Sequence, residues 1–330
     1  MGQTLTKYVQ SWIEPWIEYI VDIRMQQIMA KVKAEDISHW DTYEYEGVAM
    51  WPDVLPSTLD DLKTFEVRHD DVFIVTYPKA GTTWVQEIMS CVLHDGNIER
   101  ISKRHTFKRV PFLEMTTGGA VHNDLPRVHK MISWMPRSSP RLIKSHLQAQ
   151  LLPPQVWEKK VKLVYVIRNP KDVATSYFHH CQIMNPQRTL DWDEYFHRFH
   201  TGTVGFGKWW EHYLYFWERR NEDHILLLRF EDIKKDLRGT VQRISNFLGK
   251  SFSDDVIDDI TDHCTFENMK KNPMTNPDTL LHKIFGEQEG RSFMRKGGVG
   301  DWKAHLSESQ GKAIDDLCRD KLTSHGLTFN

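Results

Sequence analysis

Residues 72–84 read VFIVTYPKAGTTW, and this stretch decides the fold class. Its first six residues are apolar, β-branched or aromatic, which is typical of a strand buried in a sheet. A short loop containing Lys79 and Gly81 follows. Beyond the loop, apolar residues recur at helical spacing and can pack back onto the strand; they are Trp84, Val85, Ile88, Met89 and Val92. The stretch therefore predicts a strand, a tight loop and a helix in series.

The same order occurs twice more along the chain. Apolar runs at 161–167 and 225–230 are each followed by a helical pattern, at 173–181 and 233–248. Strand-then-helix units in series imply right-handed crossovers, which place the strands parallel and the helices on both faces of the sheet. We therefore expect an α/β fold with a central parallel sheet. Such sheets bind ligands where strands end and helices begin, so we expect the chemistry in those loops.

Composition narrows the class of protein. The 330 residues include 43 Lys and Arg against 45 Asp and Glu, a formal net charge of −2, so no global positive field favours nucleic acid. Hydrophobic residues make up 40% and supply a core. The sequence has no apolar run of membrane-spanning length, no signal-peptide pattern and no Cys-x-x-Cys pair among its four cysteines. These features predict a cytoplasmic protein with reduced thiols.

The loop at 77–83 has the chemistry of an anion site. Backbone N–H groups at a helix N-terminus attract phosphate, and Lys79 and the hydroxyls of Thr82 and Thr83 add charge and hydrogen bonds. The loop is P-loop-like but is not a Walker A loop, because the lysine precedes the glycine. The missing Walker A pattern argues against ATP hydrolysis as the function of this loop. The alternative is that Gly81 only serves a tight turn.

Two further loops could contribute to an anion site. Arg168 leaves the second predicted strand, and Ser176 follows about two helical turns later. The loop 293–303 combines Arg295 and Lys296 with three glycines, which allow close approach of the backbone to a ligand. Each segment alone also fits an ordinary turn or a flexible surface loop.

A short predicted strand at 141–147 carries a lysine and a histidine. Alternation puts Lys144 and His146 on the same face of that strand. A lone histidine is more often structural, and only the neighbouring lysine distinguishes His146 from the other histidines. The histidine groups at 179–181 and 197–200 lack the spacing and the carboxylate motif of a zinc site. We therefore expect no metal.

Taken together and in order, these motifs resemble the cytosolic sulfotransferase family, which uses 3′-phosphoadenosine-5′-phosphosulfate (PAPS) as donor. The resemblance covers about residues 40 to 325. Its most specific elements are TYPKAGTTW at 76–84, RLIKSHL at 141–147, RNPKDVATSY at 168–177 and RKGGVGDWK at 295–303. Supporting matches lie at 109–115, 230–236 and 270–276.

The resemblance implies a role for each matching residue. It implies that His146 is the catalytic base and that Lys79 and Lys144 act at the sulfuryl group. The family usually has a tyrosine near the adenine where this sequence has Trp210, so a stacking contact would survive without the hydroxyl. Donor contacts are implied for Lys79, Ala80, Gly81, Thr82, Thr83, Trp84, Arg168, Ser176, Trp210, Phe266, Met294, Arg295, Lys296 and Gly297.

The resemblance also implies the reaction, a transfer of a sulfuryl group from PAPS to a hydroxyl or amine of a small, largely apolar acceptor such as a phenol, steroid or alcohol. The product of the donor is 3′,5′-adenosine bisphosphate (PAP), and no metal is required. Phe112 and Phe285 match the acceptor pocket, beside His146. Two alternatives remain at this point, a nucleotide-binding adaptor without turnover and a nucleotide kinase.

The resemblance leaves the N-terminus unexplained. We expect two parts, an amphipathic extension at 1–35 and a single sulfotransferase domain at 36–330. Residues 1–6, MGQTLT, fit the N-myristoylation pattern, so a modified chain would associate weakly with membranes; the alternative is an extra packed helix.

The family's dimerisation segment also departs from its pattern. Many family members dimerise through Lys-x-x-x-Thr-Val-x-x-x-Glu. Lys303 is kept here, but Ser307, Glu308 and Lys312 occupy the other three positions. A glutamate in place of the apolar valine removes burial and adds a desolvation cost. We therefore expect a monomer or a dimer formed elsewhere.

Overall fold

The structure, a computed structural model, describes residues 41–116, 127–137, 140–185, 190–285 and 290–329. Its centre is a four-stranded parallel sheet with the order β4-β3-β5-β6. The strands are β3 (Val72–Thr76), β4 (Leu142–Ser145), β5 (Lys162–Ile167) and β6 (Ile225–Arg229). The predicted parallel sheet and all its strand positions are confirmed.

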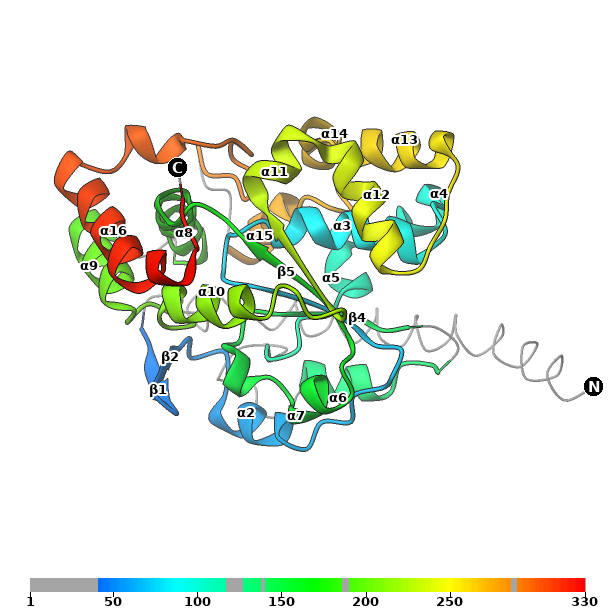
Figure 1. The fold of residues 1–330 in the computed structure, drawn as a ribbon, viewed down its shortest axis with the longest axis horizontal. Coiled ribbons are helices and arrows are strands. Elements are labelled where there is room, and N and C mark those ends of the chain that lie inside the picture. Colours follow the sequence, from blue (N-terminus) through cyan, green and yellow to red (C-terminus); the bar gives the residue numbers. More distant parts are fainter. Residues whose placement is uncertain (1–40, 117–126, 138–139, 186–189, 286–289, 330) are drawn as a thin grey trace, which may run out of the picture.

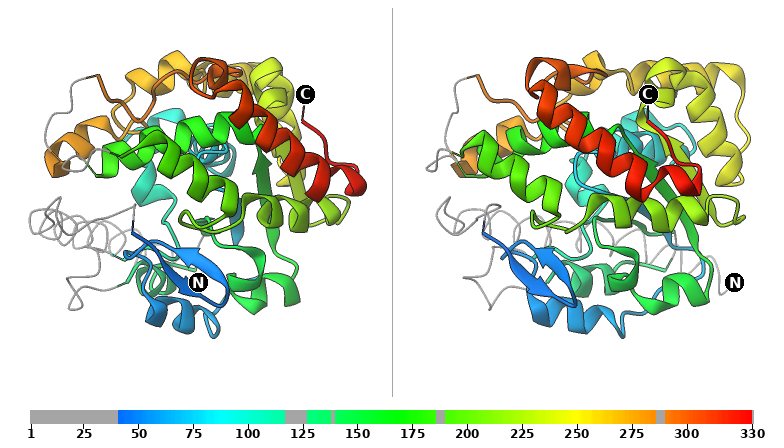
Figure 2. Two further views of the ribbon diagram at one scale, coloured as in Figure 1. Left: turned by 90° about the vertical axis from the view of Figure 1, so that its left-hand side faces the viewer. Right: turned by 60° about the vertical axis from the view of Figure 1, so that its left-hand side comes forward.

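Helices cover both faces of this sheet (Figure 1). Val72 and Ile74 of β3 pack toward α3 (Thr82–Leu93), α12 (Leu237–Phe247) and α13 (Asp254–His263). The alternate residues Phe73 and Val75 belong to a second core, which is formed with α8 (Pro170–Met184), α9 (Trp192–Thr201), α10 (Trp209–Glu218) and α16 (Glu308–Lys321). Figure 2 shows α16, in red, beside the green helices α8 and α9. The strands read as continuous apolar runs because both of their faces are buried.

One predicted helix is divided in two. The segment after β6 forms α11 (Phe230–Lys235) and then α12. Between them, Asp236 leaves the helical conformation and its carboxylate accepts the N–H of Gly239 at 2.8 Å. This N-cap satisfies a free donor of α12, so the aspartate begins a new helix instead of continuing the old one.

Shorter elements complete the described chain. β1 (Tyr43–Tyr45) and β2 (Val48–Met50) form an antiparallel hairpin. The others are α2 (Pro56–Leu62), α4 (Ile98–Ile101), α5 (Thr106–Arg109), α6 (Val128–Ser133), η2 (Ala149–Leu151), α7 (Pro154–Glu158), α14 (Phe266–Lys271), α15 (Asp278–Phe285), η3 (Asp301–Ala304) and η4 (Thr323–His325). Within the described part of the chain, none of the helices combines the length and apolar character of a bilayer span. The expected extension at 1–35 lies outside the described residues.

A buried ion pair fixes β4 beside β3. Arg141 immediately precedes β4, and its Nε donates to the Asp71 carboxylate at 2.7 Å. Asp71 directly precedes β3, and both side chains are buried. The Val72 N–H donates to the Arg141 carbonyl at 2.9 Å, so the two strands start in register. This register brings the ends of β3 and β4, and with them Thr76 and His146, to one edge of the sheet.

Candidate active site

The loop between β3 and α3 has the backbone of an anion cradle. Lys79 has φ +67° and Gly81 has φ +115°, both in the left-handed region. A Cβ on Gly81 would lie 2.9 Å from Cδ2 of the Phe230 ring, so only glycine fits this turn. Thr82 and Thr83 begin α3, where the first N–H groups have no partner within the helix. These donors and the positive end of the helix favour a bound anion.

Positive charge gathers beside this loop. The Lys79 ammonium lies 3.8 Å from the centre of the Phe293 ring, and burial lowers the pKa of Lys79 to about 7. The positive charges of Lys144, Arg168 and Arg295 contribute to this lowering of the pKa. A buried cluster of cations is costly without a counter-charge, so it favours a polyanionic ligand.

His146 lies just beyond the end of β4. Its Nδ1 is 2.7 Å from the carbonyl oxygen of Thr76. A carbonyl can only accept, so Nδ1 carries the proton and Nε2 is left as a proton acceptor. Burial, with the nearby charge of Lys144, holds the pKa of His146 well below its usual value. The imidazole is therefore neutral at physiological pH, as a general base must be.

Arg168 connects the loop at 77–83 with the loop at 295–303. This buried side chain donates through Nη1 to the Lys79 carbonyl at 3.1 Å and through Nη2 to the Gly298 carbonyl at 2.9 Å. Its guanidinium lies 4.2 Å from the centre of the Phe230 ring. Its third donor, Nε, is buried and has no partner among the described residues. An arginine so placed can brace both loops and still donate to a phosphate.

The loop after Met294 is held by hydrogen bonds to α8 and by ion pairs with Asp301 within the loop. Asp172 of α8 accepts the Gly300 N–H at 2.8 Å and the Trp302 N–H at 3.1 Å. Ser176 lies one turn further along the same helix and is half-buried. The side chains of Arg295 and Lys296 both form ion pairs with Asp301. A bound phosphate would compete with Asp301 for these two cations.

The residues implied for the adenine fall into two groups. Trp84 and Phe266 share one neighbour, the Lys234 ammonium, 6.0 Å and 5.9 Å from the two ring centres. A Cβ on Gly297 would lie 2.1 Å from Cδ2 of the Phe266 ring, so glycine is required there. Trp210 packs edge-on against Trp209 in α10, with 5.6 Å between ring centres. Its place beside the adenine stays a prediction.

Aromatic side chains surround His146. Phe112 and Phe206 meet the imidazole edge-on, with ring centres 4.9 Å and 5.5 Å from it. The Lys144 ammonium lies 3.8 Å from the centre of the Phe112 ring. The Phe285 backbone ends α15, and its side chain lies outside the described residues. The Phe112 ring, His146 and Lys144 thus form one group, as the sequence predicts.

Phe206 was missed at the sequence level, although a signal exists. It stands between Gly205 and Gly207 and has φ +68°, which is uncommon for a residue with a side chain. A Cβ on Gly205 would lie 2.1 Å from Nε1 of Trp51, so the glycine permits this close approach. An aromatic residue between two glycines indicates a side chain whose packing fixes an unusual backbone conformation. Here that packing includes the contact with His146.

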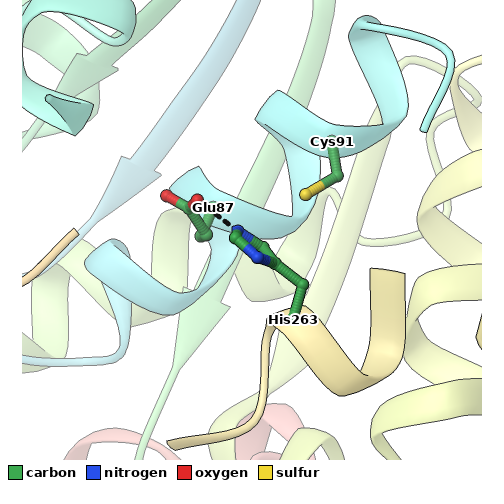
Figure 3. Close-up of side chains that lie close together, drawn as sticks. All are labelled: Glu87, Cys91 and His263. Atoms are coloured by element: carbon green, nitrogen blue, oxygen red, sulfur yellow. Dashed lines mark hydrogen bonds and ion pairs between the residues drawn. The ribbon is translucent and has the colours of Figure 1, made fainter. Parts of the chain in front are cut away.

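One trio of metal-ligating side chains occurs among the described residues, between α3 and α13. The ligand atoms of Glu87, Cys91 and His263 lie within 4.8 Å of one another (Figure 3). The Glu87 carboxylate is already paired with Arg109 at 2.7 Å and with His263 at 2.8 Å. These partners compensate the negative charge of Glu87. We therefore interpret the trio as part of a buried polar network that holds α3 against α5 and α13.

Comparisons with known proteins agree with this geometry. Residues 69–326 match the family described as Sulfotransferase domain. The chain is 39% identical to human sulfotransferase 1C2, covering 87% of this chain and 94% of that protein. It is 38% identical to sulfotransferase 1B1 of Canis lupus familiaris, covering 82% and 89%.

Solved structures have the same fold. Mouse sulfotransferase SULT7A1 complexed with PAP has a TM-score of 0.67 and 27% identity, covering 85% of this chain and 94% of that one. Retinol dehydratase in a complex with retinol and PAP has a TM-score of 0.79 and 25% identity, covering 93% and 96%. The loops, the sheet and the matched residues all lead to one assignment: the chain belongs to the cytosolic sulfotransferase family.

Proposed function

We propose that this PAPS-dependent sulfotransferase uses His146 as the base that activates a small apolar acceptor. The observation that carries the proposal is the 2.7 Å contact between His146 Nδ1 and the Thr76 carbonyl, which leaves Nε2 as a proton acceptor at the edge of the donor loop. Family membership makes the chain a sulfotransferase and sets aside the nucleotide kinase and the adaptor without turnover.

The proposed step is a direct transfer. His146 Nε2 takes the proton of the acceptor hydroxyl or amine while that oxygen or nitrogen forms a bond to the donor's sulfur. The bond from sulfur to the 5′-phosphate breaks and its electron pair stays on PAP. Lys79 and Lys144 stabilise the negative charge on the sulfuryl and phosphate oxygens. Backbone N–H groups of residues 81–83 hold the 5′-phosphate, and Arg168, Ser176, Arg295, Lys296 and Gly297 hold the 3′-phosphate.

The acceptor is proposed from the chemistry beside the base. Phe112 and Phe206 present apolar edges to His146, and a pocket of this kind favours a flat or elongated apolar molecule. A solved relative carries retinol, an apolar alcohol, together with PAP, which supports a hydroxyl acceptor of similar character. A phenol, a steroid, a primary alcohol and an amine should each be incubated with the chain and PAPS. Mass spectrometry should find an acceptor that gains one SO₃ only when PAPS is present; no such product with any acceptor would contradict the proposal.

Assembly and location follow from the same sequence features. Lys303, Ser307, Glu308 and Lys312 are exposed, and Lys312 pairs with Asp316 at 2.6 Å. This polar surface supports a monomer or a dimer formed elsewhere, and light scattering of the chain and of Glu308→Val distinguishes them.

We further propose a single domain at 36–330 in the cytoplasm, with a membrane-associated fraction if Gly2 is myristoylated. Fractionation of cells expressing the chain or Gly2→Ala tests the last point, because equal soluble fractions would contradict it.

A further inference from the structure

Glu114 lies near β4, the strand that leads to His146. It has no role in the site described above. Phe112 pairs with β4 through a single parallel bridge, and residues 113–114 form a turn directly after it. The Lys144 N–H donates to the Pro111 carbonyl at 3.0 Å, and the Leu113 N–H donates to the Lys144 carbonyl at 2.9 Å. Phe112 is thereby level with Lys144. Two residues further along both segments, the Glu114 carboxylate lies beside the His146 N–H.

The Glu114 carboxylate contacts the backbone of the base. Its Oε1 accepts the His146 N–H at 2.6 Å, and the residue is fully buried. This is the second hydrogen bond that fixes His146, after the one from its Nδ1 to the Thr76 carbonyl. Together they fix both the backbone and the ring of the residue, so the imidazole has little freedom to leave its position.

The carboxylate also acts on the catalytic lysine. Burial raises the pKa of Glu114 to about 7 and lowers the pKa of Lys144 to about 8, while the carboxylate charge raises the pKa of Lys144. Among the described residues, the other titratable groups near this pair are His146 just beyond β4, Lys79 in the loop after β3, and His212 of α10, whose Nε2 lies 3.2 Å from the His146 carbonyl oxygen. Burial lowers the pKa of both lysines, and for Lys144 the negative charge of Glu114 opposes that shift.

We infer that Glu114 is a positioning residue for sulfuryl transfer, which fixes His146 through its backbone N–H and adds a buried negative charge to the part of the site that contains Lys144. The inference rests on the proposed function, because it gives Glu114 a task only if His146 and Lys144 act in the reaction. It identifies a buried carboxylate next to the proposed base His146.

Two substitutions separate the two tasks. Glu114→Gln keeps an oxygen that can accept the His146 N–H but removes the charge. Glu114→Asp keeps the charge but shortens the side chain, so the hydrogen bond lengthens. We expect Glu114→Gln to move the alkaline limb of the pH profile of kcat to lower pH by about one unit, since a neighbouring opposite charge shifts a pKa by roughly 1–3 units. We expect Glu114→Asp to keep the limb and to lower kcat about tenfold.

Lys144→Arg identifies the group that titrates. An arginine stays charged, so the shift caused by Glu114→Gln should vanish in a Lys144→Arg background. Glu87→Gln is the matched control, because Glu87 is an equally buried carboxylate on α3. It pairs with His263 (Figure 3) and with Arg109. The substitution should lower the melting temperature and leave the alkaline limb in place.

The experiment measures kcat against pH, PAP affinity by calorimetry and the melting temperature for the full chain and each variant. PAP binding near the wild-type level shows that a variant is folded, and Glu114→Asp carries the test if Glu114→Gln does not fold. An unmoved alkaline limb in folded Glu114→Gln, or wild-type kcat in Glu114→Asp, would overturn the inference. Wild-type kcat in His146→Ala would instead overturn the proposed function, so the two failures are distinguishable.

Discussion

Replacing Arg168 by methionine perturbs one buried cation and leaves a side chain of similar length. In the structure Arg168 donates to the carbonyls of Lys79 and Gly298, and its buried Nε has no hydrogen-bond partner among the described residues. The substitution therefore has two separable effects. It loosens both donor loops, which weakens every nucleotide, and it removes a contact to the 3′-phosphate, which weakens only PAP.

The magnitude follows from the kind of bond lost. A hydrogen bond to a charged group contributes about 1.5–3 kcal/mol, and 1.4 kcal/mol is a factor of ten in affinity. The preference for PAP over AMP should therefore fall about 10- to 150-fold in Arg168→Met. The loss of the two carbonyl contacts should weaken AMP as well, by a smaller factor, because AMP still occupies the 5′-phosphate loop.

Calorimetry with PAP and with AMP, on the chain and on Arg168→Met, measures both effects. Arg109→Met is the control, since Arg109 is also buried but pairs with Glu87 away from the nucleotide. It should lower stability and keep the ratio of the two affinities. If Arg168→Met weakens PAP and AMP by the same factor, Arg168 only braces the loops and the assignment of the 3′-phosphate to it is refuted.

Three further changes have defined outcomes. Gly81→Ala forces a left-handed φ on alanine and a contact of 2.9 Å with Phe230, so it should cost about 1–3 kcal/mol and weaken PAP; calorimetry that finds wild-type affinity would contradict this. Asp71→Asn breaks the buried pair with Arg141 and should destabilise the chain by about 3–5 kcal/mol in urea unfolding, and a loss below 1 kcal/mol would show that the pair is dispensable. PAP binding should take up protons near pH 8, because its phosphates raise the pKa of Lys79 from about 7, so affinity should fall as pH rises; binding heats independent of buffer ionisation would contradict the uptake.

Much of the fold could be predicted from the sequence because its central strands are buried on both faces. Residues 72–75 and 163–167 are continuous apolar runs for that reason. The break between α11 and α12 was not predicted, because the apolar spacing continues across it. It depends on the side chain of Asp236 capping α12, a local hydrogen bond that spacing alone does not reveal.

The donor loops and the base could be predicted because short motifs carry their residues. The roles of Glu114 and Asp172 could not, although both residues lie in matched segments, since each acts through a contact far away in the sequence. A glutamate is ordinarily exposed, and Glu114 is buried only because the His146 N–H lies opposite it. Asp172 likewise acts on the loop at 300–302, more than a hundred residues later.

His146→Ala tests the central claim most directly. Rapid mixing of the chain with PAPS and an accepted phenol or alcohol, in excess over acceptor, measures the transfer step in a single turnover. The hydrogen bond from Nδ1 to Thr76 places His146 as the base, so its loss should slow transfer about 10²- to 10⁴-fold while PAP binds as before. A variant that transfers at close to the wild-type rate would show that another group takes the proton, and would contradict the account.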